Sequence, residues 1–231
     1  MSLVKVEGGW QPHRNGKPMM TPAGKALVAP TEALAEGVLA EWAGIKGPVH
    51  PSKIPFTQYL NTALDHVAPA PDAAVAGFLS HAESDTLCFR VEEPKALQER
   101  QAKEWDPWLD WLEKEISFRP FVFTGLTGMK QDQDVLKALR TRALAYDPLR
   151  LLALSQAAGL LGSATLAYAV LEGQLEMPEA LRLSMLEELF QSEEWGEPEE
   201  MRVRREDLQM ELTQLAQFIG LLNSSCETPL K

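Results

Sequence analysis

The residues best suited to chemistry lie on one predicted helix, which spans residues 178–195. Glu187, Gln191 and Glu194 follow one another at i, i+4 and i+7, so they form a polar line on one side of this helix. Carboxylates beside an apolar stripe can bind a cation or a backbone N–H group of a partner protein. Runs of acidic residues are more often solvated surface, and composition alone favours that interpretation.

The polar line borders the predicted buried face of the same helix. That face consists of four apolar residues: Leu183, Leu186, Leu189 and Phe190. Glu188 points further outward, and Glu193 projects back over the apolar side. We therefore expect Glu187, which borders the apolar face, to contribute more to binding than Glu188.

Two carboxylates on one helix face, such as Glu187 and Glu194, can also bind a metal ion or transfer protons. An acidic helical enzyme or a metal-binding protein that uses paired carboxylates is therefore the alternative function. The sequence contains no phosphate-binding loop, dinucleotide-binding glycine turn, nucleophile elbow or zinc-protease motif, and no histidine joins the pair at a suitable spacing. We expect no catalytic residue, no metal and no cofactor.

Three other groups of polar residues favour structural interpretations. His81 and Cys88 are predicted to be a half-buried histidine and an inert buried thiol rather than a reactive couple. Asp132 and Asp134 lack the central glycine and the terminal glutamate of a calcium loop, so we expect them to cap a helix. The segment 125–128 has the glycines of a phosphate-binding turn but no strand before it, which favours a flexible turn.

Three tryptophans within seven positions, Trp105, Trp108 and Trp111, are typical of either a core or a protein-binding hot spot. The helical pattern favours a core position for Trp108 more clearly than for Trp105. Trp42 completes an amphipathic stripe of an earlier helix and is also expected in the core.

The composition limits the classes of partner. The 231 residues carry a net charge of −11, and the acid excess lies after residue 67. An acidic surface repels phosphate backbones and anionic lipids, so we expect neither nucleic acid nor membrane as a partner, whereas a basic protein surface is suitable. The two cysteines, Cys88 and Cys226, are too few for a secreted disulfide scaffold, and the N-terminal residues show no signal or transit pattern. These features indicate a reducing cytoplasm.

The order of the elements predicts an α+β fold. The first thirty residues contain short alternating segments and turns, including the hairpin dipeptide Asn15-Gly16, so they predict a small antiparallel β unit. One or two helices follow, and the Ala-Pro repeat at residues 68–71 indicates a linker. We therefore divide the chain into a β-rich domain, residues 1–70, and a larger, mainly α-helical domain, residues 71–231.

The larger domain is predicted to be helical nearly throughout. Pro94 and Asp106-Pro107 are expected to begin two successive helices, the first of which ends at Trp105. The uncharged segment 151–171 is about long enough to span a bilayer, but its many small and polar residues favour one buried helix, or two broken near Gly162. The last helix carries a clean apolar stripe, which is formed by Leu208, Leu212, Leu215, Ile219 and Leu222.

Several blocks of the sequence, taken in order, resemble the F₁-ATPase α-subunit assembly chaperone family of mitochondria and bacteria. The first three blocks are Asn15-Gly16-Lys17 with Thr21-Pro22, Leu27-Val28-Ala29-Pro30-Thr31 with Leu34-Ala35 and Glu41-Trp42, and Ile54-Pro55-Phe56-Thr57 with Asn61-Thr62-Ala63-Leu64-Asp65. The next is Asp85-Thr86-Leu87-Cys88-Phe89-Arg90 with Pro94, Leu97, Gln101, Trp105-Asp106-Pro107 and Trp111. The last two are Leu161-Gly162-Ser163, and Leu186-Glu187-Glu188 with Gln191 and Trp195-Gly196. Each block alone is weak, but their order and spacing together are specific. The chain departs from the family at Phe89, where a tyrosine is common, and at Met185, where an arginine is common.

The resemblance implies a non-enzymatic chaperone that binds the free α subunit of F₁-ATPase and shields its interface until the β subunit replaces it. It also implies that Glu187 or Glu188 belongs to the functional surface, and we extend the candidate partner-binding set along the same helix to Gln191, Glu194 and Trp195. An unassembled subunit exposes apolar area that would otherwise aggregate, so it needs such a protein. We expect a monomer in the bacterial cytoplasm; the mitochondrial relatives would be in the matrix.

Overall fold

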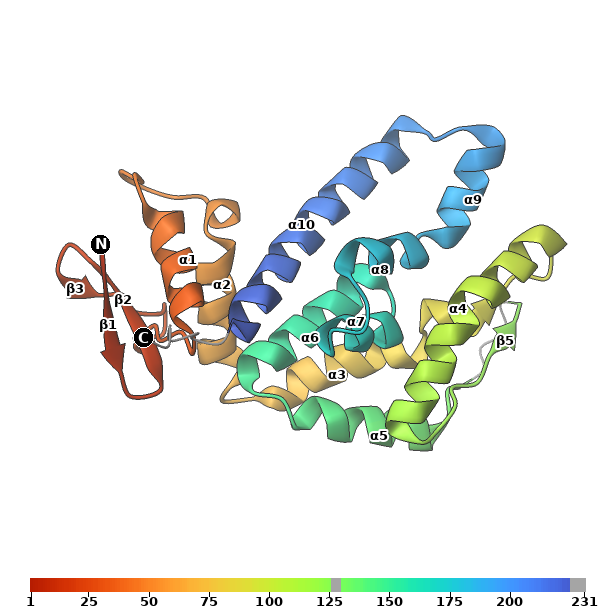
Figure 1. Ribbon diagram of the computed structural model, residues 1–231, viewed down its shortest axis with the longest axis horizontal. Helices are drawn as coiled ribbons and strands as arrows, with labels where there is room; N and C mark the ends of the chain where they lie inside the picture. Colours follow the sequence, from red (N-terminus) through yellow and green to blue (C-terminus); the bar gives the residue numbers. More distant parts are fainter. Residues whose placement is uncertain (126–129, 225–231) are drawn as a thin grey trace, which may run out of the picture.

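The computed structural model describes residues 1–125 and 130–224. A small sheet at the N-terminus, red in Figure 1, is followed by a much larger helical part that contains two further short strands. The α+β class and the order of its two parts are as predicted. The long last helix, α10, crosses the molecule and brings the end of the chain back towards the first helix (Figure 1).

The N-terminal sheet consists of three antiparallel strands in the order β1-β2-β3. They are β1 (Ser2–Val6), β2 (Gly9–Arg14) and β3 (Lys17–Pro18). The tight turn between β2 and β3 needs two residues with positive φ, and Asn15 and Gly16 adopt φ values of 53° and 74°. The predicted hairpin is therefore confirmed.

Helix α1 (Glu32–Trp42) packs against this sheet, and α2 (Pro55–Thr62) packs against α1, with a short 3₁₀ turn (Pro51–Lys53) between the two helices. The Thr31 side chain caps the first turn of α1. At the other end of α1, the Glu41 carboxylate accepts hydrogen bonds from the Thr57 backbone N–H (3.0 Å) and hydroxyl (2.7 Å). This carboxylate therefore joins the end of one helix to the beginning of the next.

The predicted linker lies between a π-helical turn (Ala63–Val67) and α3 (Pro71–Glu83). The π-helical turn and α2 both contact α6 (Pro148–Leu161), and the buried apolar residues form one cluster that extends from the N-terminal part to α10. The division into folding units at residue 70 stays a prediction.

The centre of the helical part is formed by α6 and α7 (Ala164–Leu171), whose side chains are mostly buried. Gly162 separates them with a φ of 62°, a left-handed conformation that ends α6. The uncharged segment 151–171 is thus two core helices, which was one of the two predicted arrangements. Among the described residues, no helix has both the length and the apolar character needed to cross a membrane.

The helix α4 (Lys95–Ile116) runs without interruption, so the prediction of two helices divided at Asp106-Pro107 is wrong. A proline inside a helix removes one backbone donor and costs about 3 kcal/mol. The helix continues because one unbroken stripe of its side chains is buried against the core, which offsets that cost. The stripe is Leu97, Gln101, Trp105, Leu109, Leu112 and Ile116.

The tryptophans of α4 also differ from the prediction. Trp105 is completely buried, whereas Trp108 is only partly buried and packs edge-on against Trp111, with ring centroids 6.3 Å apart. Trp42 is likewise partly buried and packs against the core. Trp105 is therefore the tryptophan of α4 that forms the core.

Short elements connect α3, α4 and α5 (Gln133–Leu144). A 3₁₀ turn (Thr86–Cys88) leads into strand β4 (Phe89–Arg90). This strand pairs in parallel with β5 (Phe123–Thr124), which follows α4 in the sequence. These elements hold the loop before α4 close to the helices that carry the predicted site.

The predicted helix 178–195 consists of two helices, α8 (Met177–Ser184) and α9 (Leu186–Trp195), so the prediction of one helix is wrong. The break lies at Met185, and α10 (Glu199–Asn223) follows after a short connection. The apolar stripe predicted for α10 is confirmed, because four of its five residues are buried and Leu208 is half-buried.

Candidate protein-binding site

The indole of Trp105 joins α4 to the α8–α9 segment. Its Nε1–H donates to the Leu183 carbonyl oxygen at 2.9 Å. In a continuous helix this oxygen would accept the N–H of Glu187, so the tertiary bond replaces a helical one where α8 ends. On the other side of the ring, the Arg90 guanidinium lies 5.1 Å from the centroid and pairs with Asp106 at 2.7 Å. The start of α9 is thus attached to α4 through the buried ring of Trp105.

Glu187 is half-buried and turns towards α4. Gln101, which is completely buried, donates from Nε2 to Glu187 Oε1 at 2.6 Å and accepts the Val91 backbone N–H at 3.0 Å through Oε1. Burial raises the pKa of the Glu187 carboxyl, and the negative charge of Glu188 raises it further. Glu187 therefore connects α9 through α4 to the segment that follows β4.

Ion pairs near the surface orient α8 and α9 on α4. Arg100 lies 2.7 Å from Glu193 and 3.1 Å from Glu104, and Arg182 lies 2.5 Å from Glu104 and 2.7 Å from Glu179. Exposed pairs of this kind each contribute roughly 0–1 kcal/mol. Their main effect is on the direction of α9 rather than on stability.

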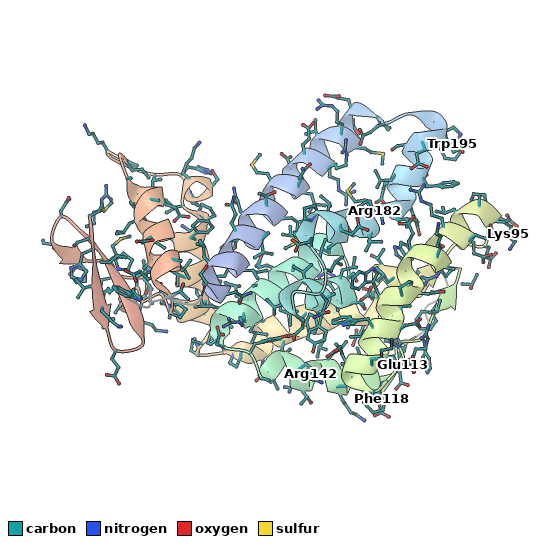
Figure 2. The ribbon with its side chains drawn as sticks, viewed as in Figure 1. Lys95, Glu113, Phe118, Arg142, Arg182 and Trp195 are labelled. Carbon is teal, nitrogen blue, oxygen red and sulfur yellow. The ribbon has the colours of Figure 1, made fainter. Side chains whose placement is uncertain are left out.

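The five predicted site residues lie in different surroundings along α9. Glu187 faces Gln101, and Glu188 is half-buried and lines a hollow beside α10. Gln191 and Glu194 are exposed, and Trp195 is 78% exposed. Figure 2 shows Trp195 at the outer end of α9, away from the core. The structure therefore separates one inward residue, Glu187, from four that face solvent or the neighbouring helix.

From the sequence, Gln101 and Arg90 are named only within the family resemblance and are given no role, although they position the site. Gln101 interrupts an apolar stripe at i+4 from Leu97 and i−4 from Trp105, and a polar residue at such a position needs a buried partner. Arg90 is buried, yet it lies in a short segment without a recognisable period. The first of these signals could have been found in the sequence.

A second buried group, the Asp85 carboxylate, fixes the segment before β4. It accepts hydrogen bonds from the Leu87 N–H (3.0 Å), the Thr165 N–H (2.8 Å) and the Thr165 hydroxyl (2.8 Å). Burial raises the pKa of Asp85, and these donors oppose the rise because they favour the charged form. Nearby, Thr86 donates to the Gly162 carbonyl at 2.9 Å. The loop is therefore tied to the junction of α6 and α7.

The other groups considered for chemistry have structural roles, such as core packing and helix capping. Cys88 is buried, its sulfur accepts from Gln131 Nε2 at 3.6 Å, and burial together with the Asp85 charge raises the pKa of the thiol. Asp132 caps α5, as predicted. Of the segment 125–128, only Gly125 is among the described residues, and Cys226 lies outside them. Across residues 1–125 and 130–224, no three His, Cys, Asp or Glu side chains are grouped so that they could hold a metal ion.

A groove of about 540 Å³ lies between α8, the start of α9 and α10. Its apolar lining residues are Met177, Leu181, Met185, Leu189, Leu212 and Ala216. Arg205 at its edge forms a two-pronged pair with Glu197, at 2.9 Å for each contact. An exposed tryptophan and an apolar groove on a rigid scaffold are features of surfaces that bind other polypeptides. Fold and site together therefore define a protein-binding protein.

Comparison with known proteins identifies the family. The ATP12 chaperone protein family matches residues 2–113. The chain is 34% identical to Atp12 from Paracoccus denitrificans, whose crystal structure superposes with a TM-score of 0.89 over 96% of this chain and 95% of that one. A mutant of the same P. denitrificans protein gives a TM-score of 0.90 at the same identity and coverage. The mitochondrial protein atp12 of Schizosaccharomyces pombe is 23% identical over 215 residues, which are 87% of this chain and 74% of the yeast protein.

This chain belongs to the ATP12 chaperone family. The resemblance inferred from the sequence is thereby confirmed, and with it a role as a chaperone in ATP synthase assembly.

Proposed function

We propose that the chain binds the unassembled α subunit of F₁-ATPase and covers its interface until the β subunit replaces it. The observation that carries the proposal is α9, which holds an exposed tryptophan beside exposed polar and acidic residues. One aromatic anchor with a few carboxylates suits moderate affinity, because charges speed the encounter while the buried apolar area stays small. A chaperone that must leave when β arrives needs this balance. The proposal includes a monomer without catalysis or cofactor.

The proposal is tested with the purified chain, isolated α subunit and assembled F₁. We expect a complex with isolated α that dissociates when β subunit is added, and no complex with assembled F₁. Size-exclusion chromatography with light scattering measures both the complex and its stoichiometry. Failure to bind isolated α, or equal binding to assembled F₁, would contradict the proposal.

The alternative of an acidic enzyme or metal-binding protein depends on Glu187 and Glu194 acting as a pair. Glu187 is hydrogen-bonded to Gln101, whereas Glu194 is exposed about two turns further along α9. Metal analysis of the purified protein tests this alternative, since a stoichiometric bound ion would support it.

Replacing Trp195 with alanine should raise the dissociation constant for α about ten-fold or more, because truncating a hot-spot tryptophan commonly has an effect of this size. The free energy of unfolding should change by less than about 0.5 kcal/mol, since this side chain is 78% exposed. Titration calorimetry and urea denaturation measure the two quantities. Phe118→Ala is the matched control, because Phe118 is 42% exposed at the far end of α4 (Figure 2). Equal effects of the two variants would exclude a special role for Trp195.

Glu187 is expected to act by positioning α9, and two substitutions separate this role from direct contact. Glu187→Gln keeps an oxygen that can accept from Gln101 and should bind α within about two-fold of the wild type. Glu187→Lys leaves the buried Gln101 amide without its acceptor, which costs about 1–3 kcal/mol of stability, and should weaken α binding and F₁ assembly. If Glu187→Gln is as defective as Glu187→Lys and equally well folded, the carboxylate contacts the partner directly.

The pH dependence of stability gives a further readout for Glu187. The pKa of this group is raised in the folded state above its ordinary value of 4.5, so the native state takes up a proton before the unfolded chain does. The contribution of Glu187 to the free energy of unfolding therefore increases as the pH falls through the raised pKa towards 4.5. Glu187→Gln should lack that part of the increase.

A further inference from the structure

A second concave surface lies on the opposite side of α10 from the apolar groove. Two adjoining hollows, of about 630 and 200 Å³, share Gly159 and Leu160 of α6 and Arg204 and Leu208 of α10. Because they share these residues, the two hollows are neighbours, and together we call them the acidic trough. Glu188 of α9 lines one end of it, so the trough adjoins the candidate binding site.

The charges around the acidic trough are strongly unbalanced. One arginine, Arg204, lines it together with five carboxylates, which belong to Glu188, Glu199, Glu200, Asp207 and Glu211. Glu199 pairs with Arg202, whereas no ion pair is formed by the other four carboxylates within residues 1–125 and 130–224. Most of the negative potential here is therefore not neutralised by the chain itself.

Three of these carboxylates form a straight row. Glu200, Asp207 and Glu211 are spaced at i, i+7 and i+11 on α10, so they lie on one side of the helix and span about 16 Å along its axis. Arg204 lies at i+4 on the same side, between Glu200 and Asp207, so the row carries three negative charges and one positive charge. Apolar side chains flank the row on both sides: Val203, which is 43% exposed, lies on one side, and Leu208, which is half-buried, lies on the other. Leu160 of α6 is also half-buried and lines the trough. Net negative charge next to exposed apolar side chains matches a helix that carries cations and apolar side chains.

The apolar groove on the other side of α10 has a different character. Its two arginines, Arg182 and Arg205, are already paired with carboxylates of the same chain. Charge complementarity therefore favours a basic partner at the trough and gives no such preference at the groove.

We propose that the acidic trough binds a basic amphipathic helix of the unassembled α subunit, a proposal that rests on the proposed function. Lysine or arginine side chains of that helix pair with Glu200, Asp207 and Glu211, while its apolar side chains cover Val203 and Leu208. Glu188 extends the contact from the trough to α9. The trough thus adds electrostatic attraction to that of the exposed carboxylates of α9.

The first test reverses the row of charges with the triple variant Glu200→Lys, Asp207→Lys and Glu211→Lys. The association rate constant with isolated α subunit should fall about ten-fold or more at low salt, and the loss should shrink with added salt because the screening length is only about 10 Å at 0.1 M. The matched control reverses three exposed carboxylates elsewhere, namely Glu7, Glu36 and Glu83. Both variants change the net charge from −11 to −5. Equal loss in both would show a general charge effect and overturn the proposal, as would no loss in the trough variant.

The second test concerns Val203, the exposed apolar side chain beside the row. Val203→Ser should raise the dissociation constant for isolated α about five-fold, because burial of part of a valine side chain is lost. Met210→Ser changes an apolar residue of the same helix that is 59% exposed outside the trough, and it should have no effect. An unchanged affinity of Val203→Ser would show that the α subunit does not cover Val203.

A synthetic probe separates failure of this proposal from failure of the proposed function. An 18-residue helical peptide of leucine and lysine should bind the wild-type chain. A peptide with glutamine in place of every lysine should bind the wild-type chain at least ten-fold more weakly, and the lysine peptide should bind the triple variant at least ten-fold more weakly. If isolated α does not bind the wild-type chain, the proposed function fails, and the peptide alone decides whether the trough accepts a basic helix. If α binds but neither α nor peptide distinguishes the triple variant from its control, the trough proposal fails while the function stands.

Discussion

Replacement of Trp105 with alanine is expected to lower the free energy of unfolding by about 4 kcal/mol, in the range found for large aromatic residues deleted from a core. The indole is completely buried, so its removal leaves a cavity, an unpaired Leu183 carbonyl and an Arg90 guanidinium without its aromatic neighbour. Urea denaturation followed by circular dichroism measures the change. Because the Leu183 bond attaches α9 to α4, binding to the α subunit should fall as well.

Trp105→Phe distinguishes packing from hydrogen bonding at the same position. The phenyl ring keeps most of the apolar contact but cannot donate to Leu183, so we expect a smaller loss of about 1–3 kcal/mol. Trp195→Ala serves as the control for tryptophan removal, since that side chain is exposed. A loss below about 1 kcal/mol in Trp105→Ala would mean that the indole does not hold the α8–α9 segment in place.

Asp85→Ala is expected to cost about 3–5 kcal/mol, similar to breaking a buried charged network. Its removal leaves the backbone N–H groups of Leu87 and Thr165 and the Thr165 hydroxyl without their shared acceptor in a closed part of the core. The loop that leads to Arg90 should then loosen, and amide hydrogen exchange at residues 85–91 should increase. Chemical denaturation and hydrogen exchange measure the two effects.

Thr165→Val provides the comparison for Asp85. It removes one of the three hydrogen bonds and leaves both backbone donors paired, so the expected loss is about 1–2 kcal/mol. If Asp85→Ala were no more destabilising than Thr165→Val, the carboxylate would contribute little beyond one hydroxyl contact.

The features predicted correctly from the sequence depend on local signals. The turn at Asn15 and Gly16, and the break at Gly162 that was one of two predicted arrangements, both require a backbone conformation that these residues adopt readily. The apolar stripe of α10 likewise follows from a period within one helix. Such features need no knowledge of what packs against them.

The features predicted wrongly depend on contacts between distant segments. Pro107 is accepted inside α4 because a long buried stripe continues on both sides of it. The break between α8 and α9 coincides with the bond from Trp105 to the Leu183 carbonyl, 78 residues away in the sequence. Spacing alone also cannot show that Glu187 turns towards Gln101 while Glu188 turns towards α10. Spacing along the sequence therefore placed the candidate residues on a helix but did not give the direction of each side chain.

The attachment of α9 at its beginning has a consequence for how this surface can evolve. Glu187 forms the internal hydrogen bond, whereas the side chains of Gln191, Glu194 and Trp195 form no hydrogen bond or ion pair with any other described residue. Under the proposed function, mutations at these three outer positions can therefore alter recognition at almost no cost to folding. Under the same proposed function, a chaperone and its client can diverge together between species along this half-helix, while the buried polar contacts beneath it keep α9 in position.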